Sequence, residues 1–199
     1  AMGGVRLGVR GLGDGITRIK ASSRMSRQAG MTACLYVVGD VLVDTGFAHA
    51  REAIVGAVAD RELRAIALTH HHEDHAANAG PLAAAHGCPV FLSQPEQRWS
   101  EGVGDLLAYR RFYWGPVLDY EPVAMPGRLA YARTLEVVPT PGHSRTHAVF
   151  HEPQSRTVFS GDLIVSSGAA AIMSHESPSQ IIDSLRRVAA LRPKRLLSG

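Results

Sequence analysis

The chain has 199 residues, 45% of them hydrophobic, and a formal net charge of +3. This length can bury one sizeable core, so we expect a single domain over residues 1–199. We predict a cytoplasmic protein without a membrane span, because there is no apolar run of about eighteen residues and no apolar secretory signal. No dense Lys/Arg block is present, so no nucleic-acid partner is expected. Cys34 and Cys88 are expected to be reduced core thiols.

The first half of the chain alternates predicted strands and helices. Strands are expected at residues 5–12, 16–20, 32–38, 41–43, 64–69 and 89–93, with a polar loop at 21–30. Gly39-Asp40 is suited to a tight hairpin turn. Apolar residues recur at helical spacing in 48–60, and 76–86 also looks helical, with Gly87 placed to end that helix.

The second half repeats this alternation. Strands are expected at 135–138, 147–152, 157–160 and 194–197. Ser177-Pro178 predicts a cap and a first-turn proline for a helix. The apolar face of that helix is expected to consist of Ile181, Ile182, Leu185 and Val188. Two strand-rich halves that each carry helices predict a layered α/β protein.

The stretch 68–80, LTHHHEDHAANAG, concentrates histidines and carboxylates after an apolar strand. His70 and His72 are two residues apart, so in an extended segment their rings project to the same side and can share one ion. Asp74 and His75 follow at the start of a helix, which aims them at a neighbouring position. Zinc accepts imidazole nitrogen and carboxylate oxygen, so the stretch predicts a metal site rather than a polar surface loop.

Two later turns add residues of the same kinds. "VPTPGH" presents His143 just after a predicted strand, and "SGD" presents Asp162 in the same way. With "LVDTG" at Asp44 and the H-x-H-x-D-H cluster, these motifs make the sequence resemble the metallo-β-lactamase-fold superfamily. The resemblance runs from about residue 32 to residue 199. It implies a four-layer αββα sandwich with a pair of metal ions at one edge of the sheets.

The resemblance also implies the ligands of a binuclear centre. They are His70, His72 and His143 at the first metal, Asp74 and His75 at the second, and Asp162 bridging the two. Two Zn²⁺ ions are expected, with iron or manganese as the other candidates. Asp44 is implied to steady the metal loop without binding the metal itself.

The other polar residues near these motifs are expected to play supporting or structural roles. His71 and Glu73, which alternate with the implied ligands, should point away from the ions toward solvent. His147 is expected to be a strand residue or a partner that supports a ligand. The histidines that match no motif are expected to be surface or packing residues, and they are His49, His86, His151 and His175.

The chain departs from the family pattern at its last residues. In relatives the final strand is followed by Gly-His, and that histidine completes the second metal site. Here "KRLLSG" stops at Gly199. We expect a chain truncated at the C-terminus; the other reading is a weakened second site.

This set of residues predicts a metal-dependent hydrolase. Two ions about 3.5 to 4 Å apart lower the pKa of a shared water toward about 7, which produces hydroxide at neutral pH. Asp74 would orient this nucleophile and carry a proton to the leaving group. No G-x-S-x-G elbow competes with this mechanism. The expected substrate is a small ester, lactone, thioester or related acyl compound.

Several alternatives within the family stay open. A glyoxalase II-like thioesterase is disfavoured because no C-terminal helical domain follows. A β-lactamase is disfavoured because no export signal is seen, and a phosphodiesterase is disfavoured because no basic insertion is present. A mononuclear iron oxidoreductase of the persulfide dioxygenase type would use His70, His143 and Asp162. A non-catalytic relative would keep the metal only as a structural clip; Asp74 argues against this reading, and the abrupt C-terminus argues for it.

Residues 94–130 form a candidate insertion between the two halves. This segment contains the aromatic residues Tyr109, Phe112, Tyr113, Trp114 and Tyr120, with Arg110 and Arg111 among them. The aromatic side chains either pack an inserted helix against the sandwich or form a lid over the metals. In the lid reading, an arginine pairs with a substrate carboxylate.

Overall fold

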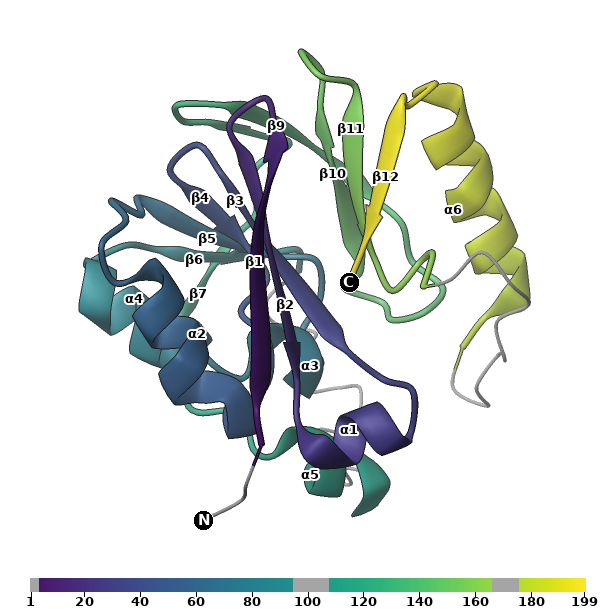
Figure 1. Cartoon of the computed structure of the whole chain (residues 1–199). Coiled ribbons are helices and arrows are strands. Elements are labelled where there is room, and N and C mark those ends of the chain that lie inside the picture. The colour runs from purple at the N-terminus through teal and green to yellow at the C-terminus, as the bar shows by residue number, and fades with distance from the viewer. Residues whose placement is uncertain (1–3, 95–107, 166–175) are drawn as a thin grey trace.

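The computed structural model describes residues 4–94, 108–165 and 176–199, and it contains two β-sheets with helices on their outer faces (Figure 1). The first sheet has seven strands in chain order, and the second has the order β12-β11-β10-β9-β8. The strands of the first sheet are β1 (Arg6–Gly13), β2 (Ile16–Ser22), β3 (Ala33–Val38), β4 (Val41–Val43), β5 (Ala65–Leu68), β6 (Val90–Leu92) and β7 (Pro122–Ala124). Those of the second are β8 (Arg128–Ala130), β9 (Thr134–Pro139), β10 (Ala148–Glu152), β11 (Thr157–Gly161) and β12 (Arg195–Ser198).

The described helices lie in the segments that connect the strands. They are α1 (Arg24–Gln28), α2 (Arg51–Val58), α3 (Glu73–Ala76), α4 (Ala79–His86), α5 (Ala108–Trp114) and α6 (Pro178–Ala190), with a 3₁₀ turn η1 (Ala48–Ala50) before α2. Gly87 ends α4 in the left-handed conformation expected for a C-terminal glycine.

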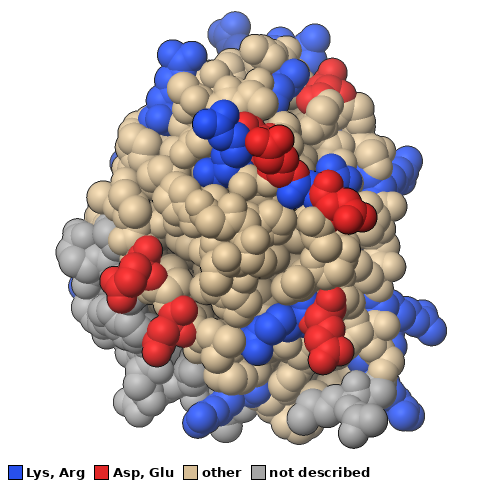
Figure 2. Space-filling view, turned by 90° about the vertical axis from the view of Figure 1, so that its left-hand side faces the viewer, with Lys and Arg blue, Asp and Glu red and all other residues tan. Residues whose placement is uncertain are grey.

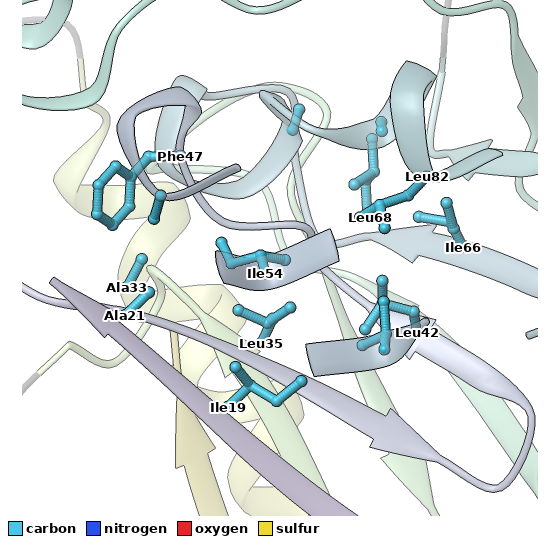
Figure 3. Packing of buried hydrophobic residues seen from close by; sticks show 14 of the residues in the cluster. Ile19, Ala21, Ala33, Leu35, Leu42, Phe47, Ile54, Ile66, Leu68 and Leu82 are labelled. Atoms are coloured by element: carbon cyan, nitrogen blue, oxygen red, sulfur yellow. The ribbon is translucent and has the colours of Figure 1, made fainter. Parts of the chain in front are cut away.

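One hydrophobic core lies between the first sheet and helices α2 and α4. Ile54 and Val58 of α2 and Leu82 of α4 are fully buried against this sheet. Figure 3 shows Ile54 lying over Leu35, with Ile19 beyond it on the neighbouring strand. Burying a side chain of this size contributes roughly 1.5 to 3 kcal/mol. This core holds the helical layer on the outer face of the first sheet.

Two further cores complete the layers. Between the sheets, Tyr36 of β3 contacts Phe159 of β11 with ring centroids 5.1 Å apart. On the outer face of the second sheet, Val188 of α6 packs against Val149 and Val158. Helix, sheet, sheet and helix thus follow one another, and the αββα sandwich expected from the sequence is confirmed.

The strand directions bring several loops to one edge of the sandwich. β4 and β5 are parallel neighbours in the first sheet. In the second sheet, β9 and β11 both run antiparallel to β10, and β12 runs parallel to β11. The carboxyl ends of these strands therefore meet at one edge, where the backbone N–H of Ala148 donates to the carbonyl of Thr69 at 2.8 Å across the two sheets.

Two expected element boundaries were wrong. The predicted loop at 21–30 contains α1, which begins after a capping box formed by Ser23 and Ser26. The predicted helix at 76–86 begins three residues later, because α3 ends at Ala76 and Asn78 is the N-cap of α4. Short polar caps within a serine-rich or alanine-rich stretch carry little periodicity, so the hydrophobic pattern did not resolve them.

The predictions for α6 were partly confirmed. Its proline lies in the first turn as expected, but the Ser177 side chain makes no capping hydrogen bond. Ile181 and Val188 pack on the second sheet, whereas Ile182 and Leu185 are 49% and 38% exposed. The residue that completes the buried face is Ser184, whose hydroxyl donates to the carbonyl of Pro141 at 2.7 Å.

Within the described ranges, no helix has the length and apolar character needed to cross a bilayer. Figure 2 shows the face on the left-hand side of Figure 1, where α4 lies. Basic and acidic side chains are interspersed on this face and do not gather into a patch of one sign.

Candidate metal centre

Three histidines form the first group at the edge where the strands end. His70 and His72 follow β5, and His143 lies in the turn after β9. Their ligand nitrogens all lie within 4.8 Å of one another, and His143 Nε2 is 3.0 Å from His72 Nδ1. Two nitrogens bound tetrahedrally to one zinc ion at roughly 2.05 Å would be about 3.3 Å apart. The spacing therefore suits a shared metal ion.

His70 provides the clearest sign that this group binds a ligand. Its ring is fully buried, its Nδ1 lies 3.1 Å from the Thr69 hydroxyl, and its Nε2 has no hydrogen-bond partner. A buried nitrogen without a partner costs free energy that a metal ion would recover. Burial lowers the pKa of His70 and of His72 well below the ordinary value, and neighbouring positive charges lower it further. Both rings are thus neutral, the form that binds metal.

A second group consists of His70, His75 and Asp162. His75 Nε2 is 3.1 Å from Asp162 Oδ1. Asp74 lies just outside this group, with its Oδ2 3.8 Å from His75 Nε2 and its Oδ1 buried without a hydrogen bond. His70 is the residue common to the two groups. The six residues expected from the sequence are thus brought to one place.

Asp44 contacts His75 on the side of the ring that faces away from Asp162. Its Oδ1 accepts the backbone N–H of Thr69 at 2.8 Å, and its Oδ2 lies 2.8 Å from His75 Nδ1. Because Nδ1 donates to the Asp44 carboxylate, Nε2 of His75, which faces Asp162, is the nitrogen that can bind a metal once its proton is displaced. Asp44 adopts a left-handed backbone with φ of 59°, which directs its side chain back toward Thr69. This is the steadying role expected for it.

The ionisable side chains of the second group shift one another's pKa values. Burial alone would lower the pKa of His75, but the carboxylates of Asp162, Asp44 and Asp74 raise it well above the ordinary value. Burial raises the pKa of Asp74. Burial also opposes ionisation of Asp162, but His75 and His143 lower its pKa below the usual range. An ion entering this group must therefore displace a proton from His75.

Glu176 is a residue of the site that the sequence did not indicate. Its carboxylate forms a short hydrogen bond with His143 Nδ1, so Nε2 of that ring is directed at His72. A carboxylate behind a ligating imidazole fixes its tautomer and orientation. Glu176 belongs to none of the motifs and lies far along the chain from His143, and only the folded arrangement shows the pair.

His147 supports Asp162. Its Nδ1 lies 2.8 Å from the Thr140 hydroxyl, and its Nε2 accepts the backbone N–H of Asp162 at 3.2 Å. Burial, with the nearby charge of His143, lowers the pKa of His147 to about 3, so the ring is neutral and can accept. The supporting role expected for it agrees with these contacts.

The expectation that His71 and Glu73 face solvent was wrong. Both are buried, with 8% and 4% of their surface exposed. His71 Nδ1 lies 3.0 Å from the Thr146 hydroxyl, and Glu73 accepts from Arg110 Nε at 2.7 Å. Neither is in a metal-ligand group, so they do point away from the candidate ions. They are buried because the segment at Thr146 and helix α5 lie against this loop.

The aromatic segment 94–130 lies partly outside the described residues, and so does the side chain of Tyr109. In the part that the structure shows, Trp114 is buried against Phe47 with ring centroids 5.1 Å apart. Tyr113 and Tyr120 also pack on the first core, whereas Phe112 is 58% exposed. These contacts fit the packing interpretation.

Arg110 of α5 pairs with protein carboxylates, since it lies 2.7 Å from Glu73 and 3.7 Å from Asp74. The lid interpretation, in which an arginine of this segment binds a substrate carboxylate, stays a prediction.

The histidines that match no motif take no part in the two metal-ligand groups within the described ranges. His49 Nε2 lies 3.1 Å from the carbonyl of Phe112, and His151 Nδ1 lies 2.8 Å from Glu136. His86 ends α4. His175 lies outside the described residues.

A cavity of about 540 Å³ opens beside the second group. Asp74 and Asp162 line one side, and Trp114 of α5 contributes an apolar wall. Gly199, after β12, also lines it, and its backbone N–H donates to the carbonyl of Gly161 at 3.1 Å. A further histidine ligand after this residue stays a prediction.

Comparison with known proteins gives independent evidence. Residues 28–199 match the family model described as "Metallo-beta-lactamase superfamily". The chain is 33% identical over 141 residues to a hydroxyacylglutathione hydrolase of Rhodobacter capsulatus, covering 69% of this chain and 48% of that protein. It is also 33% identical over 162 residues to a hydroxyacylglutathione hydrolase of Stenotrophomonas maltophilia, covering 79% and 54%. The chain thus spans about half the length of the curated relatives it matches.

Solved structures agree with this assignment. The di-iron-bound form of TTHA1623 has a TM-score of 0.65 and 28% identity, covering 80% of each chain. A metallo-beta-lactamase from Pontibacter korlensis has a TM-score of 0.70 and 19% identity, covering 97% of this chain and 90% of that one, and supports the fold alone. The matched residues include every motif of the candidate metal centre. The chain belongs to the metallo-beta-lactamase superfamily.

Proposed function

We propose that the protein is a metal-dependent hydrolase of acyl thioesters and related esters. The observation that carries this proposal is the partnerless, buried Nε2 of His70 between two groups of ligand atoms. The proposed ligands are His70, His72 and His143 at one ion, His75 and Asp74 at the other, and Asp162 at both. We assign two Zn²⁺ ions, with iron as the alternative, because a structural relative is a di-iron form.

A hydroxyacylglutathione-type thioester is the proposed substrate class. The named relatives at about one-third identity support thioester hydrolysis. Because the chain covers about half of their length, the whole protein's activity is part of the proposal. The cavity beside Asp74 and Asp162 gives an acyl group access to the metal centre. A cytoplasmic location also stays a prediction, and the two free cysteines are consistent with it.

The bound ions would supply Lewis acidity to the substrate carbonyl and to the attacking water. The chain's own residues would then handle the proton. Asp74 lines the cavity, and its Oδ2 lies 3.8 Å from His75 Nε2 at the second group, so this oxygen can accept a proton from the water. Arg110, 3.7 Å from this carboxylate, keeps it oriented, and Asp74 then passes the proton to the leaving thiolate. Asp44 and Glu176 keep the imidazoles they contact in the ligating tautomer.

Metal content and turnover measured on the same preparation test this proposal. We expect two zinc ions per chain and hydrolysis of S-lactoylglutathione that stops on chelation and returns with zinc. His72→Ala should abolish turnover, whereas His86→Ala, at the end of α4 and away from the metal-ligand groups, should leave it unchanged. A protein that binds one iron and consumes oxygen with a persulfide would contradict hydrolysis and favour the oxidoreductase. Metal binding without turnover of any acyl or phosphoryl substrate would favour a structural ion.

A further inference from the structure

The cavity beside the metal centre has a second side, formed by strands β2 and β3. Arg18 and Lys20 of β2 line it together with Cys34 and Tyr36 of β3. Arg18 is paired with Tyr36 in the sheet register and Lys20 with Cys34, so these four side chains lie on one face of the sheet. The ligand carboxylates Asp74 and Asp162 line the same cavity.

The two cations on this side have no acidic partner within the described part of the chain. Arg18 is half-buried and Lys20 is exposed, and neither forms an ion pair with any residue that the structure describes. Burial raises the pKa of the Cys34 thiol, while the charges of Arg18 and Lys20 lower it, so their positive potential reaches the cavity wall. Other described arginines near the site, such as Arg110, already face carboxylates.

The acidic ligands Asp74 and Asp162 line the same cavity, and the bound ions would offset their charge. A ligand with its acyl carbon at the metals would therefore meet positive charge within the same cavity. Met31 and Leu197 also line it and suit an apolar portion of such a ligand. A guanidinium and an ammonium that form no ion pair with any described residue are suited to an anionic group such as a carboxylate or a phosphate.

We propose that Arg18 and Lys20 form an anion-binding wall, so that the substrate is an acyl compound carrying an anionic group beyond its scissile bond. This inference rests on the proposed function, because the acyl end is placed at the metal centre. It assigns the two β2 residues as determinants of substrate specificity.

Binding of substrate mimics that cannot be hydrolysed tests this wall without depending on turnover. The probes are S-hexylglutathione, which carries carboxylates, its neutralised diethyl ester, and a phosphopantetheine thioether, which carries a phosphate. We expect the zinc-loaded double variant R18Q/K20Q to bind at least one anionic probe about tenfold more weakly than the unaltered protein, since it removes both positive charges of the wall. The probe that loses affinity identifies carboxylate or phosphate as the anion. Binding of the diethyl ester should not change.

The matched control is Arg61→Gln, which removes a positive charge in the separate pocket of Asp40 and Arg64. If the double variant does not fold, two measurements replace it. One is probe binding by Lys20→Gln alone, and the other is S-hexylglutathione binding to the unaltered protein at increasing salt, which should weaken this binding. Equal affinities in the double variant, or an equal loss with the diethyl ester, would overturn the inference. Charge-dependent binding in a protein that hydrolyses no substrate would contradict the proposed function but support the anion-binding wall. Turnover that changes neither in the double variant nor with substrate charge would contradict the anion-binding wall but leave the proposed function intact.

Discussion

The substitution Asp44→Asn tests the support behind the second metal group most directly. The carboxylate of Asp44 accepts from Thr69 through one oxygen and lies 2.8 Å from His75 Nδ1 through the other. In the variant, one amide oxygen can keep the Thr69 contact, which leaves the amide NH₂ facing His75. His75 Nδ1 must then accept instead of donating, so its proton moves to Nε2, the atom that faces Asp162.

The expected cost is a weaker metal site in a folded protein. A hydrogen bond to a charged group contributes about 1.5 to 3 kcal/mol, and losing the carboxylate behind a ligating imidazole lowers metal affinity about 10- to 100-fold. The backbone at Asp44 has φ of 59°, a conformation that asparagine accepts, so little folding stability should be lost through strain.

Competition with a chromophoric chelator measures this affinity, and the control is Asp14→Asn. Asp14 also has a left-handed backbone, with φ of 53°, but it lies in the β1–β2 turn and pairs with Arg195. Zinc affinity should fall in the Asp44 variant and stay unchanged in the Asp14 variant. Equal affinities in the Asp44 variant and the unaltered protein, or an equal loss in both variants, would refute the role assigned to Asp44.

Three further results are expected. Gly161→Ala should lower the free energy of unfolding by about 1 to 3 kcal/mol in urea, because a Cβ at this φ of 47° would lie 2.8 Å from packed side-chain atoms. The control Gly15→Ala, at a left-handed position in open space, should lose less stability. Equal losses in the two variants would contradict the packing argument. Glu176→Gln should weaken zinc binding about tenfold in chelator competition, because the carboxylate behind His143 is lost. The control Glu52→Gln on α2 should leave zinc affinity unchanged. Unaltered affinity in the Glu176 variant would contradict a supporting role for the Glu176–His143 pair. In the metal-free protein, the raised pKa of His75 means that its proton stabilises the fold below about pH 6.5 and that this contribution is lost as pH rises through the raised value. Zinc must displace that proton, so its affinity should rise with pH by up to about tenfold per unit, and a flat calorimetric pH profile would contradict the proton displacement.

Hydrophobic periodicity predicted most of the fold, and the motifs indicated the residues that the structure brings together in the candidate metal centre. Runs of strand-forming residues bounded by turns placed the strands to within one or two residues, and β3, β10 and β11 are buried at every position. The cluster at residues 70–75 stood out because its candidate ligands are nearly contiguous in the sequence. β7 and β8 were missed because they are short and mostly exposed, whereas β4 and β6 are equally short but consist of apolar residues that are buried or half-buried.

The supporting contacts could not be predicted from the sequence. Glu176 and His143 meet only because the residues before α6 lie beside the turn after β9. Glu73 is buried because α5 brings Arg110 over it, a contact between residues 37 positions apart. Arg18 and Lys20 alternate with Ile19 as any strand with one polar face does, so their position beside the metal-facing cavity depends on the packing of the two sheets.

The candidate ligands are divided between the two sheets. His70, His72 and His75 extend from the end of a strand in the first sheet, whereas His143 and Asp162 extend from strands in the second. A cation held by both sets acts as a cross-link, so its binding free energy adds to the cohesion of the sandwich. Chelation should therefore speed amide hydrogen exchange where the two sheets meet. The same ions would then contribute both to the stability of the fold and to its chemistry.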